Sequence, residues 1–452
     1  MEVDPVELAS LPRAYVIAAA GCGKTELIAD AAGATKGRSL VLTHTHAGVG
    51  ALRSRLARKQ IPRGQCSVET LDGFALRFAA SYPLTSGWDK AQPTGGDWPL
   101  VRVAAARWLR TSAAEQVLTA SYDGVYVDEY QDCTSGQHEL VDLLADILPT
   151  RLLGDPLQGI FGWAGQPLDW DLVYNRFDNA GVLETPHRWA SSNPPLGEWL
   201  VDARHKLLAG QEPDWSTPVV HTRTWSEAEE IASCQRLAGE ESVVAIRKYP
   251  SDEYKVASKL GGRFVSMEPI AARALFQAVA DLEGAEGRLL ALATIDVAAT
   301  CMTGVREKLR SAWDRLALDE EPTARPGSPV EAAVLSLRAV KRDGIVRVAE
   351  ALEAIQAIEG VRTHRAELFE EIRRAVRSRA DGSTRPLTDV AWDLRENTRR
   401  QGRVVPPRIV SRTLLVKGLE FDHAVVLRRN ELDSNDLYVA MTRPKHSLTV
   451  LR

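Results

Sequence analysis

Cysteine is scarce in this sequence, and the few cysteines present form no ligand pattern. The 452-residue chain has five of them. They are Cys22, Cys66, Cys133, Cys234 and Cys301, which lie far apart and show no CxxC or Cys/His spacing. This arrangement argues against a zinc module and a disulfide scaffold, and a reduced cytosol is the simplest setting for it.

Long apolar runs are also missing. No stretch reaches the length of about 20 residues that a membrane-spanning helix needs, and the acidic N-terminal segment lacks the pattern of a signal peptide. We therefore expect a soluble, cytoplasmic protein without a membrane partner.

The chain has no excess of positive charge. It carries 56 Lys and Arg against 60 Asp and Glu, which gives a formal net charge of −4. This balance argues against a wholly basic protein that coats nucleic acid, but it does not exclude a local basic groove. With 44% hydrophobic and 26% charged residues, the composition is that of a globular chain of about three or four domains.

What the sequence does contain, from residue 14 to about 160, is an alternation of short β-rich runs with helical ones. The runs "AYVIAAAG", "SLVLTHT", "GVYVDE" and "TRLLGD" are almost continuously apolar, as expected for strands covered on both faces. Helical segments such as "KTELIADAA" follow them, which predicts a parallel, doubly wound α/β sheet. We assign this domain to residues 1–175, with a small helical insertion at about 76–120.

A second series of strands is predicted to begin near "AGVLET" at 180–185, and it resumes with "DHAVVLRRN" close to the C-terminus. Between them, residues 286–400 are helical throughout. We expect a second core formed by 176–285 and completed by 401–452, with 286–400 as an inserted helical domain.

The stretch "AAAGCGKTELI", residues 18–28, is the strongest single motif. It follows a strand and opens a helix, so Gly21 and Gly23 let the backbone curl its N–H groups into an anion nest. Lys24 would reach the β- and γ-phosphates, and Thr25 would place its hydroxyl on Mg²⁺. Cys22 is interpreted as a small filler. The candidate nucleotide-binding residues are Ala20, Gly21, Cys22, Gly23, Lys24, Thr25 and Glu26.

Two neighbouring carboxylates, Asp128 and Glu129, end the predicted strand in "GVYVDEYQD". Alone, such a pair is usually chance clustering of acids at a strand end. With a phosphate loop upstream, Asp128 is predicted to hold Mg²⁺ and Glu129 to take the proton of the attacking water. The two motifs together predict a site of nucleoside-triphosphate hydrolysis.

Four further blocks follow in order. They are "LLGDPLQGIFGWAG" at 152–165, "LETPHRWA" at 183–190, "LLVKGLEFD" at 414–422 and "LYVAMTRPKHSL" at 437–448. With the phosphate loop and "DEYQD", this set resembles the motifs of superfamily 1 helicases of the UvrD/Rep/PcrA type. The resemblance implies two RecA-like P-loop NTPase cores with helical insertions, ATP with Mg²⁺ between the cores, and single-stranded DNA lying across both.

The resemblance also assigns individual roles. Gln158 would sense the γ-phosphate, while Arg188 and Arg443 would be arginine fingers donated by the second core. Glu420 would meet the ribose, and His187 would occupy the position of an aromatic that stacks on the adenine.

On the DNA side, Trp163 stands where the family places a base-stacking tryptophan, and His44 matches another position facing DNA. Stacking tolerates any base, which suits a motor that runs over every sequence. A core tryptophan is the alternative interpretation of Trp163.

Several positions depart from the family pattern. No glutamine precedes Lys24, although the family usually carries one that reads adenine. Ala164 stands where an arginine is expected, and Leu414 where a histidine is expected. His46 and Ala47 replace an Asn-Lys pair in a DNA-contacting block. The phosphate-binding residues are thus intact, whereas groups that link hydrolysis to DNA are missing.

The chain is short for this family, and nothing follows its last predicted strand. In this compactness it is similar to the helicase subunit of two-gene phage-defence systems of the Gabija type, which implies a nuclease partner of the OLD family.

These observations predict a DNA-dependent ATPase that translocates on single-stranded DNA, unwinds or remodels tailed DNA, and acts in repair or phage defence. The resemblance suggests 3′-to-5′ polarity. The alternative is an ATP- and DNA-sensing regulatory subunit of a nuclease complex with little processive movement. A phosphate-loop kinase or GTPase fits poorly, because it has no use for Gln158, Trp163 and Arg443 in these contexts.

Overall fold

The computed structural model describes residues 3–452 apart from 91–92, 94–95, 161–167, 270–272 and 402–403. The side chains of 250, 251, 396 and 398–401 are also outside the description. The chain divides into two compact units. The first contains residues 1–219 and 432–446, and the second contains 220–431 and 447–452.

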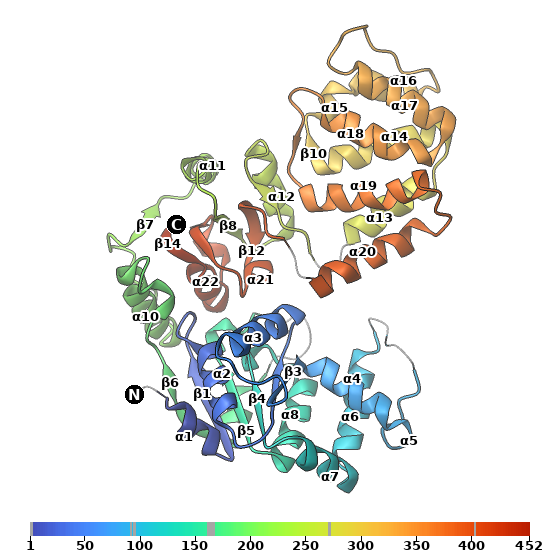
Figure 1. The fold of residues 1–452 in the computed structure, drawn as a ribbon. Coiled ribbons are helices and arrows are strands. Elements are labelled where there is room, and N and C mark those ends of the chain that lie inside the picture. The colour runs from blue at the N-terminus through green and yellow to red at the C-terminus, as the bar shows by residue number, and fades with distance from the viewer. Residues whose placement is uncertain (1–2, 91–92, 94–95, 161–167, 270–272, 402–403) are drawn as a thin grey trace. The chain divides into compact units, whose positions relative to one another are not determined.

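The first unit is built on a six-stranded sheet in which every strand pair is parallel. Its strands are β1 (Arg13–Ala18), β2 (Ser39–Thr43), β3 (Cys66–Thr70), β4 (Gly124–Val127), β5 (Thr150–Gly154) and β6 (Asp178–Leu183). They are arranged in the order β3-β2-β4-β5-β1-β6 (Figure 1). Parallel strands need crossover connections, and the helices between these strands provide them.

Alternate residues of the central strands serve two separate cores. Tyr126 and Leu153 pack with the helices α1 (Pro5–Ser10), α2 (Lys24–Ala34) and α3 (His46–Arg58). Their neighbours Val125, Val127 and Leu152 point the other way. They pack with α4 (Leu71–Ser81), α6 (Trp98–Leu109), α7 (Ser112–Ser121) and α8 (Ser135–Ile147). Because both faces are buried, the strands read as apolar runs without alternation, as predicted.

The segment predicted to be a helical insertion, 76–120, contributes to α4, α5 (Pro83–Ser86), α6 and α7. The unit also contains α9 (Trp170–Tyr174), α10 (Pro194–Leu208) and α22 (Ser434–Met441).

The predicted boundary at residue 175 is too early. The strand near 180, expected to open the second core, is β6, and it pairs in parallel with β1 through Ala14 and Asp178, and on to Ala18 and Leu183. The first unit therefore continues to Val219. An apolar run shows that a strand exists, but it does not show which sheet the strand joins.

The second unit holds another six-stranded sheet, in the order β7-β14-β13-β8-β12-β9. Its strands are β7 (Val220–Arg223), β8 (Val243–Arg247), β9 (Val265–Ser266), β12 (Arg408–Arg412), β13 (Phe421–Val426) and β14 (Pro444–Leu451), the last of which starts in residues of the first unit. The helices α11 (Glu227–Arg236), α12 (Pro250–Lys259) and α21 (Thr413–Val416) accompany them. The prediction of an α/β fold with two RecA-like cores is confirmed.

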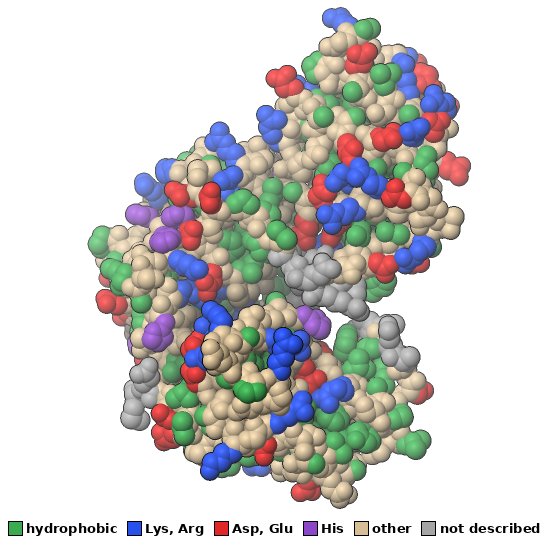
Figure 2. Space-filling model, in the orientation of Figure 1, with side chains coloured by type: hydrophobic (Ala, Val, Ile, Leu, Met, Phe, Trp, Pro, Cys, Tyr) green, Lys and Arg blue, Asp and Glu red, His purple; other side chains and the backbone are tan. Residues whose placement is uncertain are grey.

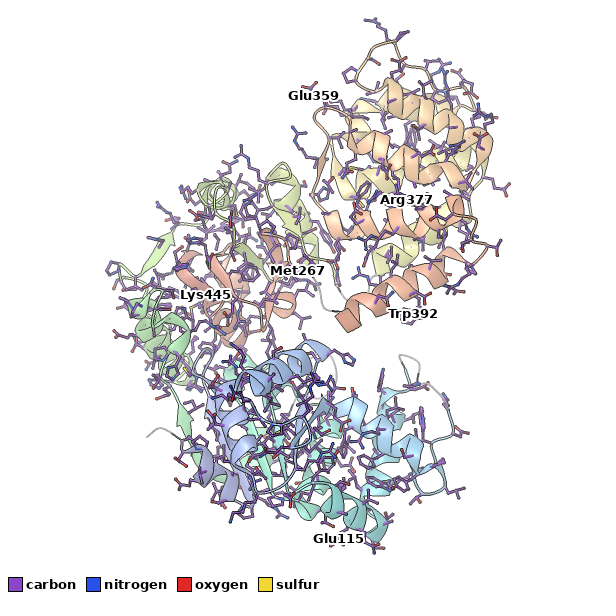
Figure 3. All side chains as sticks on the ribbon, in the orientation of Figure 1. Glu115, Met267, Glu359, Arg377, Trp392 and Lys445 are labelled. Atoms are coloured by element: carbon purple, nitrogen blue, oxygen red, sulfur yellow. The ribbon has the colours of Figure 1, made fainter. Side chains whose placement is uncertain are left out.

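The helical region of this unit begins at Arg273, earlier than the predicted 286. Its helices are α13 (Arg273–Glu283), α14 (Gly287–Cys301), α15 (Val305–Lys308), α16 (Arg310–Ala317), α17 (Glu331–Asp343), α18 (Val348–Gln356), α19 (Ala366–Ala380) and α20 (Leu387–Gln401), with the short strands β10 (Met302–Thr303) and β11 (Arg362–Thr363). They share one hydrophobic core. At the surface, Arg377 of α19, labelled in Figure 3, forms an ion pair with Glu353 of α18 at 2.5 Å.

Charge is mixed over the visible surface. Lys and Arg side chains stand among Asp and Glu on the face drawn in Figure 2. Among the residues that the structure describes, no helix has the length and apolar character to cross a lipid bilayer.

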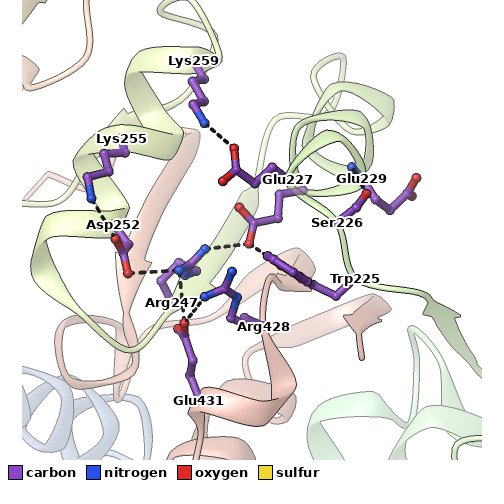
Figure 4. A network of polar contacts seen from close by, with 11 residues as sticks. Trp225, Ser226, Glu227, Glu229, Arg247, Asp252, Lys255, Lys259, Arg428 and Glu431 are labelled. Carbon is purple, nitrogen blue, oxygen red and sulfur yellow. Dashed lines mark hydrogen bonds and ion pairs between the residues drawn. The ribbon is translucent and has the colours of Figure 1, made fainter.

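A buried arginine ties the elements around the end of β8 together (Figure 4). The Arg247 guanidinium lies 2.6 Å from Glu230 of α11, 3.0 Å from Asp252 of α12 and 3.3 Å from Glu431. Arg428 also pairs with Glu431, at 2.7 Å. One guanidinium group thus forms ion pairs with carboxylates from three parts of the chain, which a hydrophobic side chain could not do.

We expect Arg247→Met to lower the free energy of unfolding of the second unit by about 3–5 kcal/mol, because it leaves buried carboxylates without their cation. Chemical denaturation measures the change. The control is Lys259→Met, which removes an exposed ion pair with Glu227 and is expected to leave the unfolding transition unchanged. Equal effects of the two substitutions would contradict the assigned role of Arg247.

Candidate nucleotide site

The loop between β1 and α2 has the backbone shape of an anion cradle. Gly21 and Gly23 adopt φ angles of 72° and 88°, a left-handed conformation that favours glycine. Gly23 is the N-cap of α2, and no side chain caps this helix end. The first N–H groups of a helix lack partners within it and attract anions, so the shape of the loop is compatible with the predicted phosphate site.

A short 3-10 helix, η3 (His187–Trp189), packs closely against this loop. A Cβ atom at Gly21 would lie 2.7 Å from the Trp189 ring and 2.9 Å from Arg188 Cβ. The Arg188 N–H donates to the Gly21 carbonyl at 3.1 Å. A Cβ at Gly23 would lie 3.4 Å from the ring of His187, whose side chain is exposed. An exposed ring beside the phosphate cradle is compatible with the predicted stacking on a nucleotide base.

Lys24 connects the cradle to the end of β4. Its Nζ lies 2.6 Å from Glu129 Oε2 and 3.4 Å from Asp128 Oδ1. Burial alone would lower the pKa of Lys24, but the charges of Glu129 and Asp128 outweigh it and raise this pKa above the ordinary value. Lys24 therefore stays charged, and its ammonium group stabilises two adjacent carboxylates, the buried Asp128 and the half-buried Glu129.

Burial has the largest effect on the pKa of Asp128. Burial raises the pKa of the Asp128 carboxyl group; the Lys24 ammonium opposes this shift and the Glu129 carboxylate adds to it. The group thus gains from any further cation placed beside it. With the hydroxyl of Thr25 in the first turn of α2, it offers the oxygen ligands that Mg²⁺ prefers, and a bound Mg²⁺ would neutralise phosphate charge there.

Glu129 reaches Lys24 through an unusual backbone turn. Its φ is 55°, in the left-handed region that non-glycine residues seldom adopt. The turn leads directly from β4 into η1 (Tyr130–Asp132), and the Glu129 N–H donates to Asp128 Oδ1 at 2.9 Å. Strain of this kind persists only where surrounding contacts enforce it, and it is frequent at functional sites.

The block "GDPLQ" is linked to Glu129 through the side chain of Gln131. Gln158, on the 3-10 helix η2 (Pro156–Gln158), donates from Nε2 to Asp155 Oδ2 at 3.2 Å. Asp155 is fully buried and pairs with Arg204 of α10 at 3.0 Å. Gln131 joins this group to Glu129. Gln131 and Arg204 were not among the predicted site residues: Gln131 lies inside a motif, whereas Arg204 carries no sequence signal.

The helix α22 also contacts the loop. The Ala20 N–H donates to the Tyr438 hydroxyl at 3.1 Å. Arg443 is buried and donates from Nε to the Val439 carbonyl at 2.8 Å. Arg188 Nη1 donates to the Thr442 carbonyl at 2.7 Å. Arg188 and Arg443 were predicted on the second core, but both belong to the first compact unit, with the phosphate loop.

Cys22 and Glu26, also in the predicted nucleotide-binding segment, are held by packing and by ion pairs respectively. Cys22 is buried, and burial raises the pKa of its thiol to about 12, so it remains protonated. The Glu26 carboxylate pairs with Arg55 and, at 2.5 Å, with Lys59. The hydrogen bond from Lys59 lowers the pKa of Glu26.

The remaining predicted residues lie elsewhere. Glu420 is exposed and immediately precedes β13, in the second unit. His44 follows β2 and is half-buried, with its Nε2 3.6 Å from Cys133 Sγ. Trp163 falls in 161–167, outside the described residues. The roles predicted for these three side chains stay predictions.

We expect Gly21→Ala to weaken nucleotide binding more than tenfold, because the added Cβ meets Trp189 and the positive φ is strained for alanine. Titration of a fluorescent ATP analogue measures the affinity. Gly50→Ala, in α3, is the matched control, since no atom lies within 4 Å of its added Cβ. Equal affinities for the two variants would count against the cradle.

Comparison with known proteins agrees with this geometry. Residues 97–169, which include the "DEYQD" and "GDPLQ" blocks, match the family model of the UvrD/REP helicase N-terminal domain. A 78-residue stretch is 37% identical to a protein named "Probable DNA helicase" from Mycoplasma pneumoniae. The aligned stretch covers 17% of this chain and 15% of the length of that relative. These matches show that part of this chain is similar to the N-terminal domain of UvrD/REP helicases and to a protein named as a probable DNA helicase.

Proposed function

We propose that the protein hydrolyses ATP and uses the energy to translocate on single-stranded DNA in the 3′-to-5′ direction, unwinding or remodelling tailed DNA. The observation that carries the hydrolytic part is the contact of Lys24 with Glu129 and Asp128 beside a glycine cradle. A charge partner for phosphate, a carboxylate base and a ligand for Mg²⁺ thus meet at one helix end.

Each residue has a defined task in this proposal. Lys24 exchanges its carboxylate partners for the phosphates of ATP, while Thr25 and Asp128 hold Mg²⁺. Glu129 accepts the proton of the attacking water. Gln158 senses the γ-phosphate, and the guanidinium groups of Arg188 and Arg443 stabilise charge that develops during transfer.

Arg188 and Arg443 need to leave their present partners to reach a phosphate group. Both guanidinium groups donate to main-chain carbonyls, of Thr442 and Val439 respectively. A rearrangement of α22 and η3 on nucleotide binding would release them, and such a rearrangement is the step that transmits hydrolysis to the DNA-binding residues.

DNA contact in this proposal comes from Trp163 and His44, with base stacking as the interaction that ignores sequence. His187 would stack on the adenine and Glu420 would bind the ribose. We place the activity in DNA repair or in phage defence. In the second case the partner would be an OLD-family nuclease, as in systems of the Gabija type.

A regulatory subunit that senses ATP and DNA is the second candidate. Its support is the loss of groups that link hydrolysis to DNA in the family, with Leu414, His46 and Ala47 in their places. Strand displacement on a tailed duplex separates the two candidates, because a sensing subunit would not unwind it.

We expect single-stranded DNA to raise the steady-state ATPase rate of the purified chain severalfold. The measurement is phosphate release with and without DNA, with Lys24→Ala as the blank that lacks the phosphate charge partner. A rate that does not respond to DNA would refute coupled translocation.

We expect Glu129→Gln to bind ATP as the wild type does but to lose turnover by at least about 100-fold, because only the proton acceptor is removed. Nucleotide titration and phosphate release measure the two quantities separately. Normal turnover by this variant would show that another group is the base.

A further inference from the structure

Gln131 occupies a buried position between two of the motifs. It lies on η1, directly after the turn at Glu129, and only 6% of its surface is exposed. The end of β5 comes very close, since a Cβ at Gly154 would lie 2.7 Å from Gln131 Oε1. A side chain at residue 154 would therefore displace the Gln131 amide.

Both polar atoms of the Gln131 amide form hydrogen bonds, one as a donor and the other as an acceptor. Gln131 Nε2 donates to Glu129 Oε2 at 2.5 Å. Gln131 Oε1 accepts the Asp155 N–H at 3.0 Å. A main-chain N–H can only donate, so Oε1 must face Asp155 and the NH₂ group must face the carboxylate. Among natural side chains of this length, only glutamine supplies both contacts.

Asp155, the partner of Gln131 Oε1, is held by contacts of its own. Asp155 is held by Arg204 in a buried ion pair and accepts from Gln158. Gln131 therefore joins the carboxylate of Glu129 to a rigid group that also holds the predicted γ-phosphate sensor. The Gln131 amide thus forms a hydrogen-bonded bridge between the "DEYQD" and "GDPLQ" motifs.

The Gln131 bridge matters because Lys24 binds the same carboxylate oxygen and is expected to turn toward phosphate. Lys24 and Gln131 both approach Glu129 Oε2. When phosphate attracts the Lys24 ammonium, its hold on Glu129 weakens, whereas the Gln131 contact still holds the carboxylate. A base must stay within hydrogen-bond reach of the attacking water to act.

We propose that Gln131 is a positioning residue for hydrolysis: it orients the general base Glu129 and couples that base to Asp155 and Gln158. This inference rests on the proposed ATPase function. Gln131 touches no reacting atom in it and acts only through Glu129.

The test compares Gln131→Leu with Gln137→Leu by steady-state ATPase kinetics and nucleotide titration on the full chain. Gln137 is a matched control: it is equally buried, at 6%, and forms the capping box at the start of α8 without contacting Glu129 or Asp155. We expect Gln131→Leu to lower kcat by about 10- to 100-fold, because a base displaced by an ångström loses that much, while KM and ATP affinity stay within roughly threefold.

Gln137→Leu is expected to retain the wild-type kcat and KM. Gln131→Glu provides a second variant in case Gln131→Leu does not fold, since it keeps an acceptor for the Asp155 N–H but sets a carboxylate against Glu129. We expect the same loss of kcat from it.

A Gln131 variant that folds and retains its kcat, or that loses kcat and ATP affinity in parallel, overturns the inference while hydrolysis by the wild type stands. Failure of the wild type to hydrolyse ATP at all overturns the proposed function, and this inference with it.

Discussion

The ammonium group of Lys24, set between Glu129 and Asp128, is the interaction on which the site depends. Two adjacent carboxylates repel each other, and Asp128 also loses hydration because it is buried. A cation is what makes that arrangement stable. The same contact fixes the start of α2 against the end of β4. In the proposed function, a phosphate group would take the place of the carboxylates beside Lys24, and a metal ion would take the place of Lys24 beside Asp128.

The parallel sheet explains why the parts of the site meet. β1, β4 and β5 are neighbours or near neighbours in one sheet, and their carboxyl ends lie on the same edge. The cradle follows β1, the carboxylates end β4, and Asp155 follows β5. Crossover helices on both faces bury the strands, so the loops at this edge are held by a rigid support.

Much of this arrangement could be predicted from the sequence, because it is local. The glycines of the cradle, the carboxylates after a strand and the apolar strands all carry their signal within a few residues. The membership of β6 in the first sheet and of α22 in the first unit could not be predicted, since it depends on long-range pairing. Gln131 and Arg204 were missed because hydrogen bonds to Glu129 and Asp155 leave no periodic pattern.

The first unit is assembled from two segments that lie far apart in the chain, and this affects how the protein folds during synthesis. Tyr438 bonds to the phosphate loop, and Trp189 donates to the Pro444 carbonyl at 2.7 Å, although more than 200 residues of the second unit separate them in the chain. Domains generally fold as the ribosome releases them, amino-terminal parts first. Here the loop between β1 and α2 emerges early but gains its contact with Tyr438 only after residues 220–431 of the second unit have left the ribosome. A nascent chain therefore lacks this loop contact until the segment that contains Tyr438 has emerged.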